Sequence, residues 1–149
     1  MTVPPVHPLL LSATTLTTCL GRGLAAHEAA LRAGRSGLAP CRFESVQLDT
    51  WIGAVDGVDA AALPAALAEY DCRNNRLAQL ALGADGFAAR VRAAVQRHGS
   101  RRVGVFLGTS TSGILETEIA YRTRDAATGA LPARMSYQGS HCPFSVTDF

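Results

Sequence analysis

Apolar residues recur at helical spacing in the second half of the chain. Phe87, Val91 and Val95 are four residues apart within residues 86–98. This spacing places them on one face and predicts an amphipathic helix. Gly99 follows directly and is expected to end it.

Similar patterns predict further helices, over residues 24–33, 63–70, 71–82 and 114–121. Gly34 is the expected end of the first, and Pro64 suits the first position of the second. Asp71 is expected to cap the third, with Leu77 and Leu80 as its buried residues. One apolar stripe along the helix over residues 24–33 is expected to consist of Leu20, Leu24 and Leu31.

Short apolar runs between turn residues indicate strands. The clearest is the start of Val103-Gly-Val-Phe-Leu-Gly-Thr-Ser-Thr-Ser-Gly113, in which residues 103–107 precede a turn of Gly, Thr and Ser. Such a run is typical of a strand buried on both faces. Residues 7–13 and 51–55 are two further candidates.

This order of strands and helices predicts an α/β fold with a mostly parallel sheet and flanking helices. The sheet is expected to be incomplete, because nothing after residue 121 resembles another buried strand. We expect one domain over residues 1–149.

Composition narrows the class of protein. The chain has 149 residues, of which 48% are hydrophobic and 17% charged, so it is richer in apolar residues than an average soluble domain. This excess indicates a large buried sheet, a subunit interface or a piece of a larger protein. The net charge of +2 comes with scattered Arg residues, which argues against nucleic-acid binding.

The N-terminal apolar segment is a poor targeting signal. No Lys or Arg precedes residues 3–13, and the segment is too short to span a membrane. We therefore expect a cytoplasmic protein without membrane partners.

The cysteines indicate neither a metal site nor a disulfide framework. They are widely spaced and form no Cys-x-x-Cys pair: Cys19, Cys41, Cys72 and Cys142. His141 precedes Cys142, but adjacent side chains rarely face each other, and Pro143 leaves no helix start beside the thiol to activate it. We expect no metal and no cofactor.

The turn at residues 108–113 has three possible interpretations. Backbone N–H groups at a helix N-terminus can bind an anion, although a P-loop Lys is missing. Ser110 could act as a nucleophile with His141 and either Asp125 or Asp148, but the Gly-x-Ser-x-Gly elbow is not matched. The simplest reading is a tight turn whose small side chains let another surface approach.

Four stretches, taken together and in order, resemble the β-ketoacyl-acyl-carrier-protein synthases, the condensing enzymes of fatty-acid and polyketide synthesis. They are Glu28-Ala-Ala-Leu-Arg-Ala-Gly-Arg-Ser-Gly37, Asp71-Cys-Arg-Asn-Asn-Arg-Leu-Ala78, residues 103–113 and Pro143-Phe-Ser-Val146. The similarity spans residues 9–149. Ala13-Thr-Thr15 differs from the Gly-Met-Gly-type turn of many relatives.

The resemblance implies the incomplete N-terminal half of a thiolase-like fold, which would work as a homodimer or with a synthase partner subunit. It implies acyl carrier protein as a partner of the full-length enzyme. It also implies a nucleophilic Cys in a Cys-Ser-Ser motif and two His, or His and Asn, that polarise the malonyl thioester. None of these positions occurs in the 149 residues, so the resemblance assigns no catalytic residue here and predicts that this chain alone is inactive.

The resemblance predicts a role for two residues of this chain. Thr111 and Phe144 match positions near the acyl pocket and the partner subunit. The resemblance favours an N-terminal fragment of a 3-oxoacyl-[acyl-carrier-protein] synthase. The alternatives are a non-catalytic shortened homologue that acts as a dimerisation or partner module, and the serine hydrolase built on Ser110.

Overall fold

The computed structural model describes residues 8–43 and 46–149. Its helices are α1 (Leu24–Arg32), α2 (Arg73–Leu82), α3 (Phe87–His98), α4 (Ile114–Arg122) and α5 (Ser145–Asp148). Short 3₁₀ helices η1 (Ala65–Tyr70) and η2 (Ser100–Arg102) and a π-helical turn η3 (Tyr137–His141) join them.

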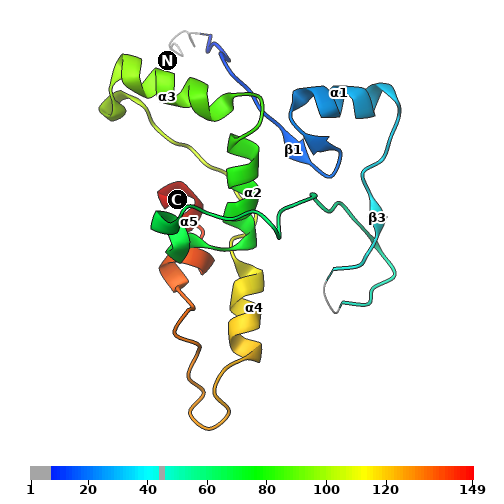
Figure 1. Ribbon diagram of the computed structural model, residues 1–149, viewed down its shortest axis with the longest axis vertical. Coiled ribbons are helices and arrows are strands. Elements are labelled where there is room, and N and C mark those ends of the chain that lie inside the picture. The colour runs from blue at the N-terminus through cyan, green and yellow to red at the C-terminus, as the bar shows by residue number, and fades with distance from the viewer. Residues whose placement is uncertain (1–7, 44–45) are drawn as a thin grey trace, which may run out of the picture.

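Helix α2 lies at the centre of the molecule (Figure 1). In this view α3 crosses above it and α4 continues below, while α1 and the strands lie to one side. On the other side η1 and α5 pack together with η3, which contacts α4. The start of α2 therefore lies beside η1 and beside segments from the C-terminal third of the chain.

The strands form short antiparallel pairs. β1 (Thr17–Thr18) pairs with β2 (Gly21–Arg22), and β3 (Ala39–Pro40) pairs with β4 (Trp51–Ile52). Thr17 lies opposite Arg22, and Ala39 lies opposite Ile52.

The predicted α/β fold, an incomplete thiolase-like half with a mostly parallel sheet, is wrong. Across residues 8–43 and 46–149 the only sheets are these two antiparallel pairs. Residues 103–107 and 8–13 form no strand, and Phe106 and Leu10 are 97% and 88% exposed. The run of apolar residues in each segment predicts a buried strand, but a strand also needs a neighbouring segment with which to exchange backbone hydrogen bonds. Position 7 lies outside the described residues.

Four of the predicted helices, unlike the predicted sheet, are confirmed. α1, α3 and α4 begin and end within one residue of the expected positions, and α2 begins two residues late. Gly34 and Gly99 have φ of 60° and 83°, which only glycine adopts readily, and both follow helix ends as expected. Pro64 precedes η1, a 3₁₀ helix rather than an α-helix.

The buried faces of the helices differ from expectation. Leu77 and Leu80 are only half-buried, whereas Asn75 on the same helix is fully buried. In α1 the buried residues are His27 and Ala30, while Leu31 is exposed. The fully buried residues of these helices are thus small or polar rather than leucines.

Asp85, in the turn between α2 and α3, anchors the start of α1. Each of its two carboxylate oxygens accepts a hydrogen bond of 3.1 Å from the backbone N–H of Leu24. One of them also accepts a hydrogen bond of 2.9 Å from the Thr15 hydroxyl. A carboxylate at a helix N-terminus satisfies an otherwise unpaired N–H group and complements the helix dipole. The cap therefore comes from a residue 61 positions away.

The molecule leaves an unusually large area exposed. Its accessible surface is 11276 Å², whereas a folded monomer of this mass exposes about 7,200 Å². The buried apolar residues among those described are small or medium in size: Ala30, Val58, Cys72 and Ala120. Much apolar surface is therefore open to contact with another polypeptide.

Candidate functional site

The turn at residues 108–113 packs tightly at its end. A Cβ added to Gly113 would overlap the carbonyl oxygen of Ser140 and would lie 3.1 Å from the Cβ of Cys72. Ser112 donates a hydrogen bond to the carbonyl oxygen of His141. The structure thus agrees with the reading of a small-residue turn that another surface approaches, here η3.

Thr111 in the same turn lines a hollow of about 270 Å³. A second hollow of about 330 Å³ adjoins it and shares the side chains of Phe43, Arg73 and Leu115. Other lining residues contribute mainly aliphatic groups: Ala39, Pro40, Ile52, Ala54, Val55, Val58 and Leu77. The lining also includes polar residues: Arg42, Asp59, Asn74 and Ser112. We call the two hollows together the Thr111 depression.

Arg73 contributes a charged group to this depression. Its guanidinium carbon lies 5.0 Å from the centre of the Phe43 ring, and its Nε donates to Asp59 at 2.8 Å. The Arg73 hydrogen bond is the main cause that lowers the pKa of Asp59, and burial of the carboxyl opposes it. Asp59 thus neutralises Arg73, while Arg42 adds a second guanidinium to the lining.

Phe144 lies elsewhere. It precedes α5, is 72% exposed, and does not line the Thr111 depression. The structure therefore does not bring together the two residues that the resemblance predicts, Thr111 and Phe144.

The serine-hydrolase arrangement does not form. His141 Nδ1 lies 2.5 Å from the hydroxyl of Thr117, not beside Ser110, and its ring packs against Tyr137 with centroids 5.1 Å apart. Asp125 instead accepts bonds from its own turn, from Thr128 and Ala127. Ser110, the nucleophile of this hypothesis, is therefore not joined to His141 or Asp125, as acyl transfer from Ser110 requires.

Cys72 is fully buried beside Gly113 at the start of α2. Burial raises the pKa of its thiol, and the negative charges of Glu116 and Asp71 add to this rise. Backbone N–H groups of Asn74 and Asn75 oppose it. A buried thiol with a raised pKa is a poor nucleophile, so this cysteine is structural.

We expect Cys72 to resist alkylation in the folded protein. Cys19, Cys41 and Cys142 are half-buried and should react with iodoacetamide at mildly alkaline pH, while Cys72 should react only after denaturation. Peptide mass spectrometry over a time course measures the four rates. Labelling of Cys72 as fast as Cys142 would contradict its burial.

Asp71 does not cap α2 as expected but pairs with Arg76. Arg76 Nε and Nη2 donate to the two carboxylate oxygens at 2.6 and 2.7 Å, a two-point geometry. These hydrogen bonds lower the pKa of Asp71 from its ordinary 3.8 against the opposing effect of burial. Cys72 takes the position before the helix instead.

We expect Asp71→Asn to cost about 1 kcal/mol or less at neutral pH, because the pair is partly exposed to water. The folded pKa of Asp71 is lowered, so its contribution is complete above the unfolded value and disappears as pH falls below about 4. Urea unfolding of both proteins at several pH values measures this. A difference that grows on acidification would have the wrong sign.

Sequence reasoning missed several residues at this centre. Asn75 and Arg73 lie in the stretch expected to begin a helix capped by Asp71, and no pattern pointed to Phe43. Arg73 on α2 contacts Phe43, which belongs to a loop far away in the sequence. The spacing of residues along a segment cannot predict such a contact.

Within the part of the chain that the structure describes, no three His, Cys, Asp or Glu side chains are placed to hold a metal ion. No helix there is both long and apolar enough to cross a membrane. A comparison of the chain with protein families, curated proteins and solved structures found no match.

Proposed function

We propose that this chain is the N-terminal portion of a 3-oxoacyl-[acyl-carrier-protein] synthase, an acyltransferase of fatty-acid or polyketide synthesis in the cytoplasm. The nucleophilic Cys and the polarising His residues would come from polypeptide outside these 149 residues. The proposal rests on the four stretches that resemble the condensing enzymes. It does not rest on a sheet, since the predicted parallel sheet is wrong.

The observation that carries the proposal is the position of Thr111. The resemblance matches this residue to the acyl pocket. The residue borders a depression whose lining combines apolar side chains, such as Phe43 and Leu115, with polar ones, such as Asn74. Binding sites for apolar groups are typically concave and lined by such side chains. The role proposed for this chain is to provide one wall for the acyl group.

The large exposed area supports a role within an assembly. Apolar side chains are strongly exposed in two uncharged segments, residues 9–11 and 105–107. We propose that a second copy or a synthase partner subunit covers such surface, and that acyl carrier protein meets the assembled enzyme. Alone, the chain is expected to self-associate during sedimentation, and a compact, stable monomer would contradict this part of the proposal.

Acyl transfer by a condensing enzyme starts with attack of a Cys thiolate on a thioester, which forms an acyl-enzyme and releases the carrier thiol. The described cysteines do not lie in a Cys-Ser-Ser motif, and Cys72 is buried. Incubation with an acyl thioester should therefore leave all four cysteines unmodified. Stoichiometric acylation of any of them would refute this assignment.

Acyl binding tests the proposed pocket directly. A fluorescent fatty acid should bind saturably, and Thr111→Phe should weaken binding about tenfold or more because the larger ring fills the depression. Thr109→Phe is the matched control, since Thr109 is exposed in the same turn and does not line the depression. Equal binding by the two variants would reject the pocket.

A second candidate is a non-catalytic homologue that acts as a dimerisation or partner module. The strongly exposed apolar side chains of residues 9–11 and 105–107 favour it, because a partner subunit would cover them. The genomic reading frame after codon 149 separates the two. A frame that continues into a Cys-Ser-Ser motif supports the synthase portion, whereas a stop codon beside an intact synthase gene supports the module.

A further inference from the structure

A separate cavity of about 240 Å³ lies between η1, α2, α4 and the segment that leads into η3. It shares no lining residue with the Thr111 depression. Its volume far exceeds the roughly 10–15 Å³ that one water molecule needs. Its lining is rich in charged side chains: Glu69, Asp71, Arg76, Glu116 and Arg134.

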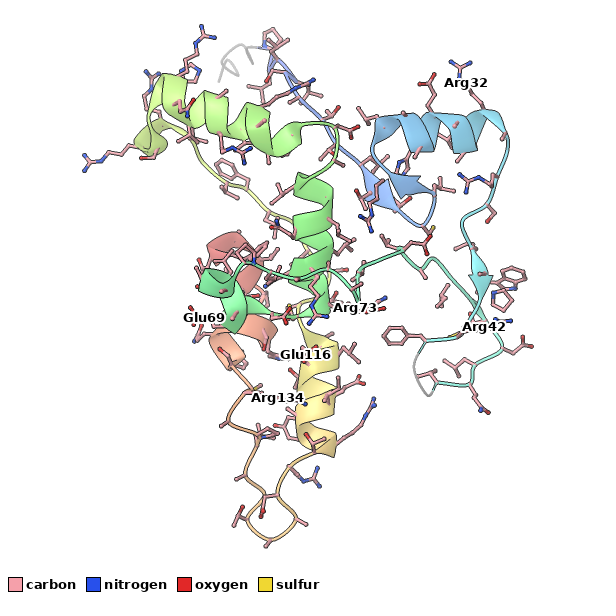
Figure 2. All side chains as sticks on the ribbon, viewed as in Figure 1. Arg32, Arg42, Glu69, Arg73, Glu116 and Arg134 are labelled. Atoms are coloured by element: carbon pink, nitrogen blue, oxygen red, sulfur yellow. The ribbon has the colours of Figure 1, made fainter. Side chains whose placement is uncertain are left out.

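Two of these five charges neutralise each other. Asp71 and Arg76 form the two-point pair described above, which occupies both groups. Among the described residues, the side chains of Glu69, Glu116 and Arg134 form no hydrogen bond or ion pair. They come from three segments: Glu69 from η1, Glu116 from α4 and Arg134 from the chain that leads into η3 (Figure 2).

The unpaired groups comprise two carboxylates and one guanidinium. The field of Glu116 reaches Arg76, where it adds to the rise in pKa caused mainly by Asp71. Glu116 is half-buried, so its charge is less well hydrated than those of Glu69 and Arg134, which are exposed at the mouth of the cavity. Unpaired charges of both signs around one cavity are complementary to a ligand that carries both signs itself.

We propose that this cavity binds a basic α-amino acid. Its two cationic groups match the carboxylates of Glu69 and Glu116, and its carboxylate matches the planar guanidinium of Arg134. A divalent cation fits less well, because Arg134 would repel it and the described residues hold no three-carboxylate group arranged for a metal. An anion such as phosphate would face two carboxylates.

Titration with L-lysine, followed by calorimetry at low ionic strength, tests the proposal. Lysine should bind saturably, norleucine and cadaverine should each bind at least about tenfold more weakly, and added salt should weaken the interaction. Norleucine lacks the second cation, and cadaverine lacks the carboxylate. Absence of saturable lysine binding, or equal binding of all three compounds, would overturn the proposal.

Variants then locate the site. Glu116→Gln and Arg134→Gln should each reduce lysine affinity about tenfold or more. Glu118→Gln is the matched control on α4, because Glu118 pairs with Arg122 and does not line the cavity. Thermal melting checks that each variant folds. Lysine affinity unchanged by Glu116→Gln and Arg134→Gln would reject the site.

The proposed function can fail independently. Thr111→Phe alters only the Thr111 depression, so it should leave lysine binding unchanged while it weakens fatty-acid binding. Loss of lysine binding in Thr111→Phe would show that the two cavities are not separate and would overturn this assignment.

Discussion

Gly113→Ala is expected to destabilise the protein by about 3 kcal/mol or more. The added methyl group would overlap the carbonyl oxygen of Ser140, and it would also crowd Cys72 Cβ at 3.1 Å. The backbone φ of −74° suits alanine, so the cost comes from packing and not from backbone strain. Relief requires η3 to move away from α4, which would disturb the packing of these two segments against each other.

Gly108→Ala is the matched control at the other end of the same turn. A Cβ at this position meets nothing within 4 Å. The substitution should be neutral or should stabilise the protein by about 0.4–1 kcal/mol, because alanine reduces the freedom of the unfolded chain. Urea unfolding of the two variants gives the comparison. Equal stabilities would show that η3 does not pack against Gly113.

Asn75→Asp is expected to have the second large effect. The Asn75 side chain is fully buried, its Nδ2 donates to the Tyr70 carbonyl oxygen at 2.9 Å, and its Oδ1 has no partner. A carboxylate at this position would lose the donor and bury a negative charge against a carbonyl oxygen. The expected cost at neutral pH is about 3–5 kcal/mol.

The pH dependence identifies the cause. Burial would raise the folded pKa of the introduced carboxyl above its unfolded value, so the protonated form is favoured in the folded state. The destabilisation should therefore be largest at about pH 8 and should diminish towards about pH 5, where the protonated carboxyl can donate a hydrogen bond to the Tyr70 carbonyl oxygen. Unfolding relative to the unsubstituted protein at both pH values measures this.

Asn74→Asp provides the control for charge at the start of α2. Asn74 is only half-buried, and an acidic residue in the first turn of a helix is favourable. The variant should differ little from the unsubstituted protein at either pH. If Asn74→Asp and Asn75→Asp were equally destabilised, the effect would not arise from burial.

The candidate site was only partly predictable. Thr111 came from the resemblance, and the small-residue turn that contains it came from its composition. Phe43 and Arg73 complete the depression from positions 30 residues apart in the sequence, and Glu69, Glu116 and Arg134 meet from three segments. Neither grouping has a local spacing by which it could have been recognised.

The sequence by itself determined the helices. The regions of α1, α2, α3 and α4, and the glycines that follow α1 and α3, could be located because helical hydrogen bonds and end signals lie within a few residues of each other. The tertiary structure alone decided which segments pair and which side chains are buried. Residues 103–107 have the composition of a buried strand, yet they form none, because strand hydrogen bonds must come from another segment. For the same reason Asn75, rather than Leu77 or Leu80, is buried at the centre: burial depends on the surfaces that approach a helix, and these come from distant parts of the chain.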